Sequence, residues 1–182
     1  MKTRLFLIFF FIFFSFETNA QRGVFEIARN GCAEDLQYIL ENNPEVINFK
    51  NNSGFTPLIL ACYNGNIEAA TFLAKHVEDI NVNSDVGTAL MAAVYKNNIE
   101  ISKMLLELKA DPNIADPNGT TALHYAVRFS NIELIKLLVG YGADIDLKDE
   151  KGFSSWDYAI QNNNKPILLI LKNRFDQMKL RI

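Results

Sequence analysis

The feature of this sequence that most constrains its fold is a segment that recurs four times in register. Thr56, Thr88, Thr121 and Ser154 stand at equivalent positions, spaced 32, 33 and 33 residues apart. The copies cover residues 54–61, 86–93, 119–126 and 152–159, and each ends on an alanine. A period of this length predicts stacked units, each of which buries its apolar face against its neighbours.

The second half of each unit repeats as well. Asn66-Ile67-Glu68, Asn98-Ile99-Glu100 and Asn131-Ile132-Glu133 each open an apolar run whose spacing is that of one face of a helix. Residues 27–31 and 36–40 look like the end of a truncated first unit. The pattern therefore predicts about five helix-turn-helix units.

Residue types at the unit boundaries agree with this prediction. Thr and Ser at the four equivalent positions are good N-caps for a first helix, and Pro57 suits its first turn. Glu34, Glu68, Glu100 and Glu133 stand near the start of each second helix, where the helix dipole favours a negative charge. The turn between helices is expected to be left-handed, and its residues are Gly31, Gly65, Asn97, Ser130 and Asn163, of which Ser130 fits worst.

These motifs resemble the ankyrin repeat. Thr-Pro-Leu at 56–58, Thr-Ala-Leu-His at 121–124 and Gly-Ala-Asp at 142–144 carry the resemblance, which covers nearly all of residues 22–182. Tetratricopeptide repeats have a similar period but lack the glycine turn and the Gly-Ala-Asp. The resemblance implies an all-α fold: an ankyrin-repeat solenoid of about five helix-turn-helix units with short projecting turns.

In this register the chain divides into a truncated N-terminal capping repeat at 21–50, full repeats at 51–83, 84–115 and 116–148, and a C-terminal capping repeat at 149–182. The repeat at 84–115 is one residue short before Thr88, so its projecting turn is expected to be stubbier.

The first 20 residues have the pattern of a secretion signal. Lys2 and Arg4 precede an apolar run over residues 5–14, and Thr18-Asn19-Ala20 provides small residues before a cut. We expect cleavage after Ala20 and a periplasmic or secreted product. The alternative is an uncleaved membrane anchor over residues 5–16, which is short of the ~20 apolar residues that a spanning helix needs.

Composition and charge exclude several partners. The chain is 49% hydrophobic and 21% charged, as expected of a folded protein. Its net charge is -3, and removal of residues 1–20 leaves -4. Nucleic acids and anionic membranes need concentrated Lys and Arg, so the predicted partner is another protein.

No cluster of residues predicts catalysis, a cofactor or a metal. A nucleophile paired with a base is not evident. His124 falls in the slot where the family's histidine supports a neighbouring turn by hydrogen bonding. Asp79, Asp111, Asp144 and Asp146 recur with the repeat and are expected to bond their own turns rather than calcium. Cys32 and Cys62 are not in equivalent positions, so two separate thiols are favoured over a disulfide.

The resemblance implies a binding surface made by the projecting turns and the exposed end of each first helix. Two ladders of residues fall there, one of Arg29, Tyr63, Tyr95, Arg128 and Gln161, and one of Asn30, Asn64, Lys96, Phe129 and Asn162. Tyr and Arg commonly anchor protein interfaces. The predicted partner-binding residues are Phe55, Tyr63, Tyr95, Lys96, Arg128, Phe129 and Phe153. The alternative is that these aromatic side chains only pack between adjacent repeats.

These observations predict a monomeric, non-enzymatic protein-protein interaction module that is exported and acts as an inhibitor, an immunity protein or a protective scaffold. A small exported enzyme on a repeat scaffold and a membrane-anchored adaptor remain as alternatives.

Overall fold

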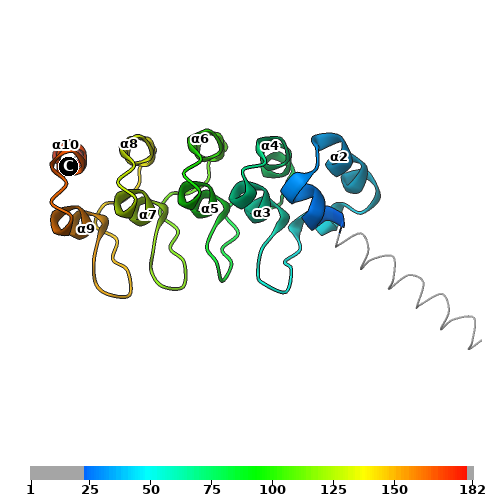
Figure 1. Ribbon diagram of the computed structural model, residues 1–182, viewed down its shortest axis with the longest axis horizontal. Helices are drawn as coiled ribbons and strands as arrows, with labels where there is room; N and C mark the ends of the chain where they lie inside the picture. The colour runs from blue at the N-terminus through cyan, green and yellow to red at the C-terminus, as the bar shows by residue number, and fades with distance from the viewer. Residues whose placement is uncertain (1–22, 180–182) are drawn as a thin grey trace, which may run out of the picture.

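The computed structural model describes residues 23–179, with side chains to residue 172, and in this range the regular elements are all helical. The first helices of successive repeats form one layer: α3 (Pro57–Asn64), α5 (Ala89–Tyr95), α7 (Ala122–Arg128) and α9 (Ser155–Gln161). The second helices form the other layer: α4 (Ile67–His76), α6 (Ile99–Glu107), α8 (Ile132–Gly140) and α10 (Lys165–Lys179). The predicted all-α solenoid is confirmed (Figure 1).

A shorter unit precedes α3. It consists of helical residues 23–30, α2 (Ala33–Asn42) and the 3-10 helix η1 (Pro44–Asn48). The proposed signal sequence and the alternative anchor lie outside the described residues. Between residues 23 and 179, none of the helices is both long and apolar enough to cross a membrane.

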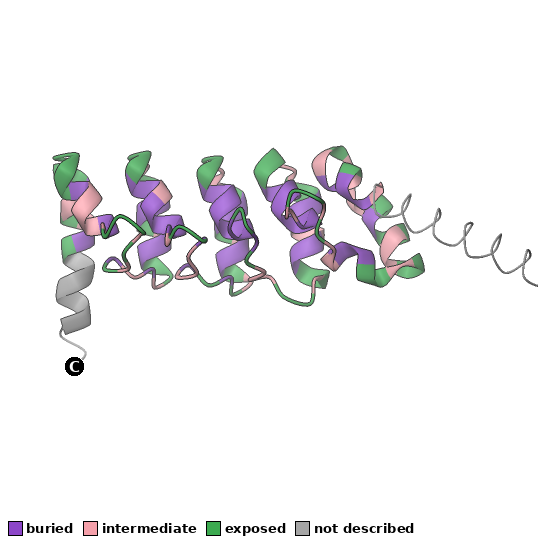
Figure 2. Ribbon diagram, turned by 90° about the horizontal axis from the view of Figure 1, so that it is seen from below, coloured by how far each residue is buried: buried purple, intermediate pink, exposed green. Residues whose placement is uncertain are grey.

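The first helices are the most buried elements because they pack between both neighbouring repeats. Every residue from 89 to 94 in α5 is buried, for example. Ala61, Ala93, Ala126 and Ala159 are fully buried, and their small side chains let adjacent helices approach closely. The second helices are amphipathic and bury leucines such as Leu73, Leu105 and Leu138. In Figure 2 the ends of the helices and most of the projecting turns remain accessible.

Side-chain caps begin the helices of both layers. Thr56, Thr88 and Ser154 accept the backbone N–H three residues on, as predicted. In the second layer the equivalent caps are asparagines, because the Oδ1 atoms of Asn66, Asn98 and Asn131 accept the N–H groups of Ala69, Ile101 and Leu134.

The inter-helix turn is left-handed at four of its five predicted positions. The φ angles are 73° at Gly65, 59° at Asn97, 55° at Ser130 and 48° at Asn163, so the poorly fitting serine adopts the same conformation. The prediction is wrong for Gly31, whose φ is not positive. Glycine is required there by close approach instead, since a Cβ would lie 2.8 Å from the Cα of Ile27.

The turns project from the first-helix layer, as the loops below α3, α5, α7 and α9 show in Figure 1. In three of them a backbone N–H donates to the carbonyl four residues on, from Asn51 to Phe55, from Asp116 to Thr120 and from Asp149 to Phe153. In the remaining turn Ser84 donates to Gly87, only three residues on. The turn before α5 is therefore one residue shorter than its neighbours.

Candidate functional site

Five aromatic side chains from three repeats form a continuous cluster, which we call the aromatic cluster. Its members are Phe55, Tyr63, Tyr95, Tyr125 and Phe129. Tyr63 stacks on Tyr95 with ring centroids 6.2 Å apart and planes at 14°, and Phe55 lies 6.3 Å from Tyr63. Tyr95 makes T-shaped contacts with Tyr125 and Phe129, with ring centroids 5.7 Å and 5.6 Å apart. The cluster thus connects the turn before α3 with the ends of α3, α5 and α7.

These rings are packed and accessible at the same time. The exposed fraction is 38% for Tyr63, 49% for Tyr95 and 50% for Phe129, while Phe55 and Tyr125 are partly buried. The two interpretations of the ladder are therefore compatible, because the rings contact one another across repeats and still present apolar area to solvent.

A hollow of about 230 Å³ lies within the aromatic cluster. Its lining comprises Phe55, Ile59, Tyr63, Val86, Met91, Ala92, Tyr95 and Tyr125. Ala92 holds the repeat position that Leu60 and Tyr125 hold in the other full repeats and Tyr158 holds in the C-terminal capping repeat. The hollow therefore lies in the repeat that has the smallest side chain at this position and the shortest projecting turn.

Two exposed cations stand beside the aromatic cluster. The Lys96 Nζ lies 4.8 Å from the centroid of the Tyr63 ring, over its face. Arg128 is exposed next to Phe129 at the end of α7. Among the described residues, ion pairs join Arg29 to Glu26 and Lys103 to Glu107, and neither Lys96 nor Arg128 takes part in one.

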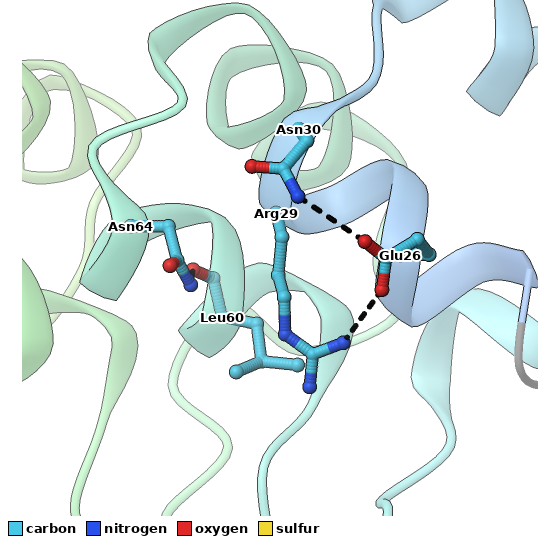
Figure 3. Close-up of polar contacts among 5 residues, drawn as sticks. All are labelled: Glu26, Arg29, Asn30, Leu60 and Asn64. Atoms are coloured by element: carbon cyan, nitrogen blue, oxygen red, sulfur yellow. Dashed lines mark hydrogen bonds and ion pairs between the residues drawn. The ribbon is translucent and has the colours of Figure 1, made fainter.

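The N-terminal end of the ladder is different. Arg29 and Asn30 both donate to the Glu26 carboxylate, at 3.2 Å each, and the Arg29 guanidinium extends toward Leu60 of α3 (Figure 3). Asn64 donates to the Leu60 carbonyl of its own helix. Arg29 therefore has a carboxylate partner in its own unit, in contrast to Lys96 and Arg128.

Phe153 does not join the aromatic cluster. Its ring contacts Tyr158 at 5.6 Å, and Tyr158 in turn meets His124 at 6.0 Å. Phe153 therefore lies apart from the other predicted partner-binding residues. Two projecting turns separate it from Phe55 in the first turn.

His124 holds α7 to the next projecting turn. Its side chain is fully buried, its Nδ1 accepts the Thr121 backbone N–H at 3.1 Å, and its Nε2 lies 3.2 Å from the Phe153 carbonyl oxygen. The proton is therefore on Nε2 and donates to that carbonyl. Burial lowers the pKa of His124 below its ordinary value, although hydrogen bonding to Phe153 opposes the shift. The predicted structural role of this histidine is confirmed.

The sequence reasoning missed Tyr125. It lies four residues before Phe129, a spacing that places two side chains on the same face of a helix. Its hydroxyl donates to Asp116 at 3.2 Å, and Tyr158 donates to Asp149 in the same way one repeat later. Burial, followed by the neighbouring Asp116 carboxylate, raises the pKa of Tyr125.

Three of the four aspartates predicted to bond their own turns do so, whereas Asp146 takes part through its backbone N–H, which donates to Asp144. Asp79, Asp111 and Asp144 each accept the N–H two residues on, as predicted. No group of three or more His, Cys, Asp or Glu side chains in the described residues could hold a metal ion. Both cysteines are free, with Cys62 fully buried and the Cys32 Sγ 3.2 Å from Asp35. Burial raises the pKa of the Cys62 thiol.

This architecture defines a class of helical repeat proteins, in which two layers of helices carry a row of projecting turns. The family model described as ankyrin repeats (3 copies) matches residues 24–116 and 108–180. The chain therefore belongs to the ankyrin-repeat family. Repeats of this family are generally non-enzymatic modules for protein-protein interaction.

Relatives match the chain over part of its length. It is 33% identical over 111 residues to the human BCL-6 corepressor-like protein 1, which covers 60% of this chain and 6% of that protein. It is 33% identical over 108 residues to the rat ankyrin repeat and SAM domain-containing protein 6, covering 58% and 12%. For the rice probable E3 ubiquitin-protein ligase XBOS33 the identity is 34% over 102 residues, covering 54% and 20%. The similarity spans a small part of each relative.

Proposed function

We propose that this chain is an exported, non-enzymatic ankyrin module that binds a partner protein through the aromatic cluster and the cations beside it. The observation that carries the proposal is the combination of half-exposed Tyr95 and Phe129 rings with Lys96, which has no carboxylate partner among the described residues. Aromatic and cationic side chains of this kind dominate binding energy at protein interfaces.

The proposed biological role is inhibition of, immunity to, or protection of the bound protein. A module without chemistry of its own acts by covering a surface of its partner, so its effect depends on which surface is bound. The ligase name of the rice relative belongs to a protein of which this chain matches 20%, and it brings no activity to this chain.

Affinity capture from an extract of the source organism tests the binding proposal. The bait is the full chain in the form recovered from cells that produce it. We expect one protein to be retained, and Tyr63→Ala combined with Tyr95→Ala to reduce its retention at least about tenfold, as for residues that dominate an interface.

The matched control removes two tyrosines outside the aromatic cluster. Tyr38 in α2 and Tyr141 after α8 are 70% and 43% exposed, so Tyr38→Ala with Tyr141→Ala removes comparable surface. Equal retention by both double variants, with intact helical circular dichroism, contradicts the proposed binding surface.

The proposed export is tested by sequencing the N-terminus of the protein recovered from the source cells. We expect a chain that begins at Gln21 and is found outside the cytoplasm. A membrane-bound chain that retains residues 5–16 would support the anchored alternative instead.

A further inference from the structure

The hollow in the aromatic cluster has the size of one large side chain. A dry cavity of about 150 Å³ holds a benzene molecule, and small-molecule sites usually begin near 300 Å³. At about 230 Å³, with a lining dominated by aromatic and aliphatic groups, this hollow suits a single ring or a long aliphatic side chain.

The hollow lies at the one repeat whose side chain at this position is small, since Leu60, Tyr125 and Tyr158 are the equivalents of Ala92. Tyr125 and Tyr158 fill their own positions and bond the carboxylates of Asp116 and Asp149 in the projecting turns. In α5 the equivalent of these tyrosines is Ala92, and the equivalent turn residue is Ser84, whose hydroxyl donates to the Gly87 carbonyl within the turn. The space at this position is therefore left unfilled in one repeat, where a side chain from another molecule would fill it.

The rim of the hollow carries a positive charge. Lys96 lies over Tyr63, one of the lining rings, and is exposed. The Asp116 carboxylate is buried and already accepts from Asn118, Thr120 and Tyr125. Asp85 is exposed at the tip of the short turn, packed toward Gly54 of the preceding turn. A ligand seated in the hollow therefore meets Lys96, a cation that pairs with no carboxylate in the part of the chain that the structure describes.

We propose that this hollow receives one large apolar side chain, aromatic or the size of leucine or methionine, from a partner segment that carries an Asp or Glu within two residues of it. The carboxylate pairs with Lys96. The inference rests on the proposed function and specifies the chemistry of the partner at this surface.

Selection of a random displayed peptide library against the full chain tests the inference. We expect enriched sequences to share one large apolar residue with an acidic residue one or two positions away. Synthetic peptides from this selection should bind at least about tenfold more weakly to Ala92→Leu, which fills the hollow with the residue found at position 60. Val86→Asp, in the exposed turn, is expected to weaken the binding of these peptides to a similar degree without disturbing the core.

The charge part of the inference has its own variant. Lys96→Gln should weaken the binding of peptides that carry the acidic residue about two- to fivefold. It should also reduce the dependence of their binding on salt, as expected for an exposed ion pair. The control Ile160→Ala changes a 52% exposed residue of α9, remote from the hollow, and should leave binding unchanged.

Three results would overturn the inference. One is a selection that enriches basic or uncharged sequences, and another is binding that Ala92→Leu and Val86→Asp both leave intact. The third is a captured partner that Tyr63→Ala with Tyr95→Ala releases but Ala92→Leu retains, in which case the proposed function stands and the hollow is not its site. If none of these variants affects a captured partner, the proposed function fails as well.

Discussion

At the scale of single residues, His124 makes two hydrogen bonds, one to the cap of its own helix and one to the next projecting turn. It accepts the N–H of the helix cap Thr121 and reaches the Phe153 carbonyl of the next turn. The equivalent residue in the preceding repeat is Met91, which lines the hollow. His124 therefore joins its first helix to the following turn, whereas Met91 at the equivalent position lines the hollow.

His124→Met, which copies the preceding repeat, is expected to lower the free energy of unfolding by about 1–3 kcal/mol, because the Phe153 carbonyl loses its partner. The substitution should also flatten the dependence of stability on pH between 7 and 5. The lowered pKa means that the unfolded chain takes up a proton near pH ~6.5, whereas the native histidine takes it up only at a lower pH. Native stability is therefore complete above pH ~6.5 and falls as the pH decreases. Chemical denaturation at several pH values measures both effects.

The control is His76→Met. This histidine is exposed and stacks on Phe72 of its own helix. Its replacement should change stability by less than about 0.5 kcal/mol. An unchanged pH dependence in His124→Met would show that the buried imidazole is not its source.

At the scale of elements, the second helices are attached to the preceding repeat through their caps. The Asn66 Oδ1 caps α4, while its Nδ2 donates to the Gly31 carbonyl at 2.8 Å. Glu68 in the same first turn accepts the Ala33 N–H at 2.9 Å. The start of α4 therefore satisfies polar groups in two repeats at once, which couples helix formation to stacking.

Asn66→Ala is expected to lower the free energy of unfolding by about 1–3 kcal/mol, through loss of the cap and of the bond to Gly31. Asn66→Asp keeps the acceptor and loses the donor, so it should cost less. Thermal unfolding monitored by circular dichroism gives the order. Asn64→Ala, two residues earlier at the exposed end of α3, is the control because its side chain bonds only its own helix. Equal losses in Asn66→Ala and Asn66→Asp would assign the whole effect to the bond with Gly31.

At the scale of the whole molecule, stability is shared between neighbours along the stack. α3, α5 and α7 pack in sequence, as do α4, α6 and α8, so a central repeat is supported on both sides. Within the described residues, the unit before α3 and the repeat of α9 and α10 contact a neighbouring unit on one side only. Loss of packing in a central repeat should therefore destabilise the repeats on both sides of it.

Leu105→Ala, at a fully buried position of α6, is expected to reduce the free energy of unfolding by about 2–5 kcal/mol through the cavity it leaves. Hydrogen exchange should accelerate in α5, α6 and their neighbours α4, α7 and α8. Leu169→Ala, at a 61% exposed position of α10, is the control and should cost less than about 0.5 kcal/mol. Uniform acceleration along the whole stack would contradict nearest-neighbour coupling.

The sequence by itself determined the all-helical repeat architecture and the exposed Tyr63, Tyr95 and Phe129, because caps, turn residues and a fixed period act over short distances along the chain. Repetition then carries the same local geometry from one unit to the next. The sequence did not reveal that the Phe153 ring, in the last turn, contacts Tyr158 rather than the aromatic cluster.

Only the tertiary structure decided how Tyr125 joins Tyr95, why Gly31 must be glycine without a positive φ, and where the hollow lies. Each of these depends on the distance between atoms of different helices, or on the space left between them. The short turn before Thr88 is visible in the sequence, but the hollow beside Ala92 arises from the way three consecutive repeats stack around one small side chain.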